Sequence, residues 1–215
     1  IHLAAKKGKN NVLKLLLDNT SSSSNSVSAV DRDKNTPLHL ACAGNGDFDT
    51  VTILLQKSEN KERLVSAANE SQQTPLHLAS KKGKNRSLKL LLESSSSNSV
   101  SAEDKDKNTP LHLVCAAPHH TGDFDTARLL LQKSGINVRS LVNLANEDQE
   151  TPIQLEVKSG KNNISFFMKK LETLEENGVS IDFLVDPSDL PSLIFYNDFK
   201  EIDWFLQVSN TIILL

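Results

Sequence analysis

The five-residue phrase Thr-Pro-Leu-His-Leu occurs three times, at Thr36–Leu40, Thr74–Leu78 and Thr109–Leu113. A weakened copy, Thr-Pro-Ile-Gln-Leu, begins at Thr151, and a truncated copy, Ile-His-Leu, begins at Ile1. The four threonines are separated by 38, 35 and 42 residues. Self-similarity at such a period is the mark of a repeat protein, so the chain is predicted to stack similar units instead of forming one globule.

The phrase itself predicts the start of a helix. Threonine caps a helix through its side-chain oxygen, and proline suits the first helical position because its missing N–H has no partner there. A second apolar run follows in each unit, at Val12–Leu17, Val51–Leu55, Leu88–Leu92, Ala127–Leu131 and Ile164–Met168. The two runs predict an antiparallel helix pair whose apolar faces are covered by the neighbouring pairs.

The phrase and its spacing resemble the ankyrin repeat over most of the chain. The resemblance implies an all-α helical solenoid with β-hairpin-like finger loops that project at right angles from the helices. We expect five repeats over residues 1–185, with bounds near 1–30, 31–68, 69–103, 104–145 and 146–185, the first being truncated. Residues 186–215, rich in aromatic side chains, are expected to form a degenerate sixth repeat or a C-terminal cap.

Alternate repeats are more alike than adjacent ones. The segment Lys6–Asn10 returns as Lys81–Asn85, and Gly46–Thr50 returns as Gly122–Thr126. Tandem duplication of a two-repeat block, 73 residues long from Thr36 to Thr109, accounts for this pattern.

The connections between repeats depart from the family in two ways. Ankyrin turns commonly place glycine shortly before the Thr-Pro, where φ is positive, whereas this chain has Lys34, Gln72, Lys107 and Gln149. Each costs of order 1 kcal/mol if φ stays positive, and less rigid fingers are expected. The serine-rich tracts Thr20–Ser26 and Ser94–Ser99, with the insertion Pro118–Thr121, are expected to be flexible, solvated extensions.

The sequence offers no catalytic motif, and we predict that the chain is not an enzyme and binds no cofactor and no metal. His2, His39, His77 and His112 recur once per repeat, and the resemblance implies that each bonds to the turn backbone and to the threonine of its phrase. His119-His120 stands without a third ligand. Cys42 and Cys115 occupy equivalent places in repeats too far apart for a disulfide, so we expect reduced thiols and a cytoplasmic protein.

Surface recognition is the function that remains. The resemblance implies that finger tips and the exposed ends of the first helices line a concave surface that holds a partner protein. The candidate residues are Arg32, Asp33, Asn35, Glu70, Ser71, Gln73, Lys81, Lys82, Lys105, Asp106, Asn108, Glu147, Asp148 and Glu150. Their mixture of lysines and acidic or amide tips favours a partner of mixed charge, steered in its approach by these charges.

The first interpretation is therefore a non-catalytic scaffold or adaptor module, either a monomer or part of a longer chain. The alternative is the targeting arm of a larger enzyme, or of a bacterial effector acting in a host cytosol, with its catalytic domain outside this sequence. The formal net charge of −3 and the lack of interleaved aromatic residues argue against nucleic acid. No apolar run reaches the ~18 residues of a membrane-spanning helix.

Overall fold

The computed structural model describes residues 1–19, 23–117, 124–134, 138–161 and 169. These residues form helices and turns, and none of them lies in a β-strand. The helices are α1 (His2–Lys6), α2 (Asn10–Asp18), α3 (Ser23–Ser28), α4 (Pro37–Ala43), α5 (Phe48–Gln56), α6 (Lys61–Ser66), α7 (Pro75–Lys81), α8 (Asn85–Glu93), the 3₁₀ helix η1 (Ser97–Ser101), α9 (Pro110–Ala116), α10 (Phe124–Ser134), α11 (Val138–Asn143) and α12 (Pro152–Lys158).

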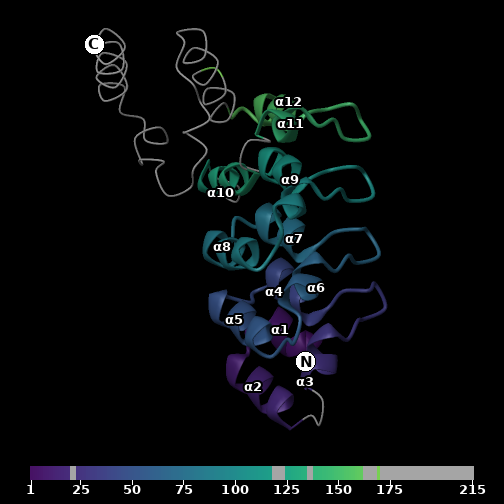
Figure 1. The fold of residues 1–215 in the computed structure, drawn as a ribbon, viewed down its shortest axis with the longest axis vertical. Coiled ribbons are helices and arrows are strands. Elements are labelled where there is room, and N and C mark those ends of the chain that lie inside the picture. Colours follow the sequence, from purple (N-terminus) through teal and green to yellow (C-terminus); the bar gives the residue numbers. More distant parts are fainter. Residues whose placement is uncertain (20–22, 118–123, 135–137, 162–168, 170–215) are drawn as a thin grey trace, which may run out of the picture.

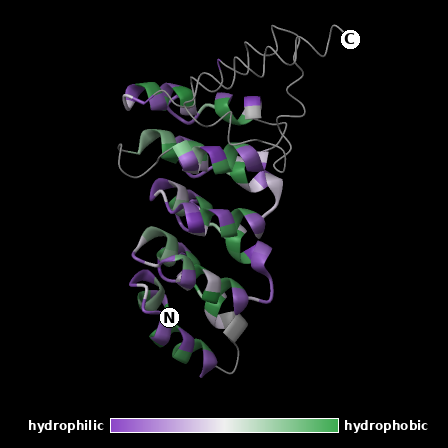
Figure 2. Cartoon of the chain, turned by 90° about the vertical axis from the view of Figure 1, so that its left-hand side faces the viewer, coloured by the Kyte–Doolittle hydropathy of each residue, from purple (hydrophilic) through white to green (hydrophobic). Residues whose placement is uncertain are grey.

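The repeats stack in a single row, as the period predicts (Figure 1). The first helices α1, α4, α7, α9 and α12 pack one on the next, and the second helices α2, α5, α8 and α10 form a parallel column beside them. The loops between repeats project from the column of first helices, on the side opposite the second helices (Figure 1). In Figure 2 each repeat is one layer of the stack, and its helices carry both hydrophobic and hydrophilic residues.

The core runs continuously along the stack. Leu38, Leu76 and Leu111, from the repeated phrase, are 0–1% exposed, and Leu54, Leu88 and Leu130 are fully buried in the second helices. A fully buried leucine stabilises the fold by about 1.5–3 kcal/mol. Since each repeat supplies only half of every interface, its stability depends on its neighbours.

The predicted helix starts are confirmed. Thr36, Thr74, Thr109 and Thr151 are the N-caps of α4, α7, α9 and α12, each followed by proline. The four second helices in the described residues contain the predicted apolar runs. The fifth run, Ile164–Met168, the insertion Pro118–Thr121 with His119-His120, and the predicted sixth repeat or cap at 186–215 lie outside the described residues.

The serine-rich tracts differ from the expectation of flexible loops. The first contributes to α3 and the second to η1. Each short helix buries a single valine, Val27 or Val100, at 1–2% exposure. At the equivalent place in the second and fourth repeats, α6 and α11 bury the pairs Leu64-Val65 and Leu141-Val142. These short helices form because one or two buried apolar side chains are enough to hold a helical turn against the core. The serine content of the segments gives no sign of these side chains.

Candidate functional site: the finger loops and the first helices

The histidine of each phrase ties its helix to the next finger. In the second repeat the Thr36 N–H donates to His39 Nδ1 at 3.1 Å, and Thr36 Oγ1 lies 2.8 Å from the same nitrogen. Nδ1 is thus an acceptor, so the proton is on Nε2, which donates to the Gln73 carbonyl at 3.0 Å. The predicted structural role, a bond to the turn backbone and to the threonine of the phrase, is confirmed for His39, His77 and His112.

The same bridge recurs along the stack. His2 Nε2 lies 3.0 Å from the Asn35 carbonyl, His77 Nε2 3.1 Å from the Asn108 carbonyl, and His112 Nε2 3.1 Å from the Glu150 carbonyl. Burial lowers the pKa of His39 to about 4 and also lowers the pKa of His77 and of His112. The rings of His39, His77 and His112 are therefore neutral structural donors, and since both nitrogens of each are hydrogen-bonded, neither is free for a metal or for general-base catalysis.

A ladder of hydrogen bonds joins each finger to the next. Among side chains, Asn69 Nδ2 donates to Asn35 Oδ1 at 2.9 Å, and Asn146 Nδ2 donates to Asn108 Oδ1 at 3.0 Å. Gln73 Nε2 donates to Asp104 Oδ2 at 3.2 Å. Three of the predicted binding residues, Asn35, Gln73 and Asn108, therefore lie half-buried inside the ladder instead of at the tips.

Backbone groups complete the ladder at the tips. The N–H groups of Glu70, Lys105 and Glu147 donate to the carbonyls of Asp33, Ser71 and Asp106, at 2.8, 3.0 and 2.9 Å. Sequence reasoning missed this ladder because it depends on the spacing between repeats, which no local pattern contains. No strand is formed in the described part of these loops, so their β-hairpin-like geometry stays a prediction.

Each finger turns through one residue in the left-handed region. The residues are Lys34, Gln72, Lys107 and Gln149, with φ between 57° and 61°. The turn keeps the positive φ that favours glycine. A residue with a Cβ atom has a higher conformational energy than glycine at this φ, so each of the four turns is strained. The regularity of this angle and the inter-finger ladder show a defined finger geometry where the sequence suggested looser loops.

The remaining predicted tip residues are exposed to solvent. They are Arg32, Asp33, Glu70, Ser71, Lys105, Asp106, Glu147 and Asp148. Glu70 Oε2 lies 2.9 Å from Lys34 Nζ, and its other oxygen lies 3.9 Å from Lys105 Nζ. The hydrogen bond and charge of Lys34, followed by the charge of Lys105, lower the pKa of Glu70. Neighbouring tips thus carry charges of opposite sign.

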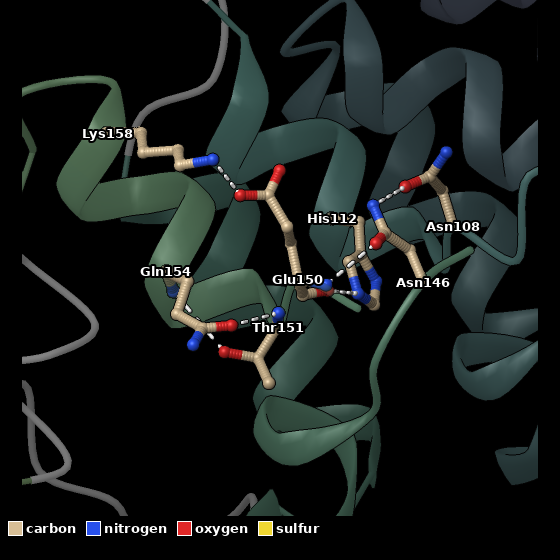
Figure 3. Close-up of polar contacts among 7 residues, drawn as sticks. All are labelled: Asn108, His112, Asn146, Glu150, Thr151, Gln154 and Lys158. Atoms are coloured by element: carbon tan, nitrogen blue, oxygen red, sulfur yellow. Dashed lines mark hydrogen bonds and ion pairs between the residues drawn. The ribbon is translucent and has the colours of Figure 1, made fainter. Parts of the chain in front are cut away.

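The finger at residues 146–150 is held by hydrogen bonds to the preceding repeat and by an ion pair with α12 (Figure 3). The Glu150 carbonyl accepts from His112, its N–H donates to Asn146 Oδ1 at 2.9 Å, and its carboxylate forms an ion pair with Lys158. Thr151 caps α12 with Gln154 in the place of the histidine, and the Thr151 N–H donates to Gln154 Oε1 at 2.8 Å. Glu150 is therefore half-buried and already paired.

The lysine pair of the third repeat lies at the far end of α7. Lys81 is the last residue of this helix and Lys82 its C-cap, and both are exposed. A seven-residue helix spans about 10 Å, which separates the pair from the finger base at Thr74. Cationic side chains at a helix C-terminus oppose the helix dipole favourably, so the position accounts for their type.

Metal and thiol chemistry finds no support among the described residues. No group of three or more histidine, cysteine or acidic side chains there is placed to hold a metal ion. Cys42 and Cys115 are free and buried, and burial raises the pKa of the Cys42 thiol to about 12 and that of Cys115 in the same direction. Within the same residues, every helix is too short or too polar to cross a bilayer.

Comparison with known families agrees with this architecture. A family model described as ankyrin repeats (3 copies) matches residues 1–101 and 42–141. Ankyrin repeats are typically non-catalytic and generally serve protein–protein interaction. The matched residues cover the phrase, the bridging histidines and the ladder of the first four repeats, and the chain belongs to the ankyrin repeat family.

Proposed function

We propose that this chain is a scaffold or adaptor module that holds one partner protein against the tip surface. We define the tip surface as the exposed finger residues Arg32, Asp33, Glu70, Ser71, Lys105, Asp106, Glu147 and Asp148, together with Lys81 and Lys82. The observation that carries the proposal is that the finger side chains are exposed while the backbone of the fingers is fixed by the ladder. A surface ordered before binding loses little conformational entropy when the partner arrives.

The charges favour a partner of mixed charge. Arg32 and Lys105 alternate along the tips with Glu70 and the pair Glu147-Asp148, while the lysine pair lies about a helix length away. Exposed charges of this kind govern the rate and orientation of approach more than the final affinity. The two free, buried cysteines support a reducing compartment, and we place the protein in the cytosol.

The test begins with a photo-crosslinking residue at Ser71 on a finger tip. The matched control carries the same residue at Gln56, exposed at the end of α5. A protein captured from the native cell through position 71 and not through position 56 is then measured for affinity. The double variant Lys81→Glu/Lys82→Glu is expected to weaken an acidic segment of that partner severalfold with little change in thermal stability, since both side chains are exposed. Unchanged affinity would reject a role for the lysine pair.

A further inference from the structure

The middle residue of the finger turn is acidic in three of the four fingers. The residue just before the left-handed position is Asp33, Ser71, Asp106 or Asp148. The ladder places these residues at equivalent points, because the carbonyls of the first three accept from the N–H of the next finger. Along the row of fingers the second one therefore carries a hydroxyl where the others carry a carboxylate (Figure 1).

The hydroxyl of Ser71 is presented on a fixed turn. Its side chain is exposed, and its Oγ makes no hydrogen bond to any described residue. The backbone is held on both sides, since the Ser71 N–H donates to Asn69 Oδ1 at 3.0 Å and the Ser71 carbonyl accepts from the Lys105 N–H at 3.0 Å. By contrast, the exposed Ser66 donates its hydroxyl proton to the Arg63 carbonyl at 3.4 Å. Ser71 is thus open to a modifying enzyme.

Two ammonium groups from the neighbouring fingers reach the second finger. Lys34 Nζ lies 2.9 Å from Glu70 Oε2, and Lys105 Nζ lies 3.9 Å from Glu70 Oε1. Glu70 precedes Ser71 in the same turn, so a phosphate group on Ser71 would lie within reach of both flexible lysine side chains. Phosphate oxygens pair with such cations through charge-assisted hydrogen bonds. The finger is therefore a favourable place for a phosphoserine.

We propose that Ser71 is a phosphorylation site that switches the charge of the tip surface, an inference that rests on the partner-binding role proposed above. In the reaction, Ser71 Oγ attacks the γ-phosphorus of a nucleoside triphosphate bound to a protein kinase. The oxygen–phosphorus bond forms, the bond to the β,γ-bridging oxygen breaks, and the nucleoside diphosphate leaves. The hydroxyl proton passes to a base of the kinase. The product carries a charge of about −1.5 to −2 where the other three fingers carry aspartate.

This phosphate inverts the net charge of the first three turns, residues 32–34, 70–72 and 105–107. Their charged side chains are all exposed, and four basic against three acidic ones give a net charge of +1: Arg32, Lys34, Lys105 and Lys107 against Asp33, Glu70 and Asp106. A further charge of about −1.5 to −2 makes the total negative. An acidic segment of the partner is attracted to the unmodified turns and repelled by the modified ones, so phosphorylation releases it.

Phosphoserine incorporated genetically at position 71 tests the local pairing without a partner. The control carries phosphoserine at Ser66, exposed at the end of α6. Phosphorus NMR follows the second ionisation of each phosphate, whose pKa is ordinarily about 6. Lys34→Ala/Lys105→Ala is expected to raise the pKa of the phosphate at position 71 by about 0.5 and to leave that at position 66 unchanged. An equal pKa with and without the two lysines would overturn the pairing.

The modification itself is tested with an extract of the native cell and added ATP. Mass spectrometry of the recombinant chain after incubation is expected to find a phosphate on Ser71, and Ser71→Ala should lose that phosphopeptide alone. Protein isolated from the native cell in the presence of phosphatase inhibitors should carry the same phosphopeptide. Ser71 without phosphate in both preparations would overturn the assignment of the site.

The charge switch is tested with the partner captured in the crosslinking experiment. Phosphoserine at position 71 is expected to weaken its affinity about tenfold at low salt, while phosphoserine at position 66 and Ser71→Ala should leave the affinity within about twofold. Unchanged or tighter binding by the form phosphorylated at position 71 would overturn the switch. A partner captured equally through Gln56 would instead refute the proposed function, and the phosphate titration and the mass spectrum would still decide whether Ser71 is a phosphorylation site.

Discussion

Replacing Gln72 with glycine is expected to stabilise the protein. Gln72 has φ of 57°, its side chain is exposed, and its backbone N–H donates to the Asn69 carbonyl at 2.9 Å, a bond that glycine retains. The left-handed conformation costs a non-glycine residue about 1–2 kcal/mol. Glycine removes that cost but gives the unfolded chain about 0.4–1 kcal/mol of extra conformational entropy. The net increase in the free energy of unfolding is about 0.5–1 kcal/mol.

Urea unfolding followed by far-ultraviolet circular dichroism measures this change, compared at equal m-values. Gln72→Ala is the matched control, because alanine removes the same side chain and keeps the strain, so its stability should stay within about 0.5 kcal/mol of the parent. Lys107→Gly should reproduce the gain of Gln72→Gly. The reasoning is refuted if Gln72→Gly is no more stable than Gln72→Ala, since the left-handed turn would then store no strain.

Two further predictions concern buried polar groups. Burial holds the pKa of His39 at about 4, below its ordinary 6.5, so the unfolded state binds the proton more readily than the folded state. The free energy of unfolding should therefore fall by up to about 3 kcal/mol as pH drops from 6.5 to 4. His39→Gln, which copies the Thr151–Gln154 cap, should flatten this part of the stability–pH curve, and an unchanged slope would assign the loss to other groups. Ser80 Oγ is buried without a hydrogen-bond partner at the place where Cys42 and Cys115 stand, so Ser80→Cys should raise the free energy of unfolding by about 1 kcal/mol. Cys42→Ser should lower it in the same urea titration, and a destabilised Ser80→Cys variant would contradict the argument.

The sequence alone was sufficient for features that depend on neighbours along the chain. Thr36 and His39 meet through a contact three residues apart, which the helix geometry forces wherever the phrase occurs. The apolar runs predict α2, α5, α8 and α10 because a helix must bury one face. The family's glycine marked Gln72 as a residue that is strained if φ stays positive, and the structure decided that φ is positive and that the fingers have a definite geometry.

Other features depend on how one repeat lies against the next, and only the tertiary structure decided them. The ladder from Asn69 to Asn35 and the reach of Lys84 to three carbonyls of the preceding repeat join residues more than 30 positions apart. Their geometry is set by the packing distance between layers, so sequence patterns within one repeat cannot contain it. The same holds for the half-buried state of Asn35, Gln73 and Asn108, and for the short helices anchored by Val27 and Val100. The repeat pattern determined which units form, and the stacking of those units determined which of their polar groups remain available to a partner.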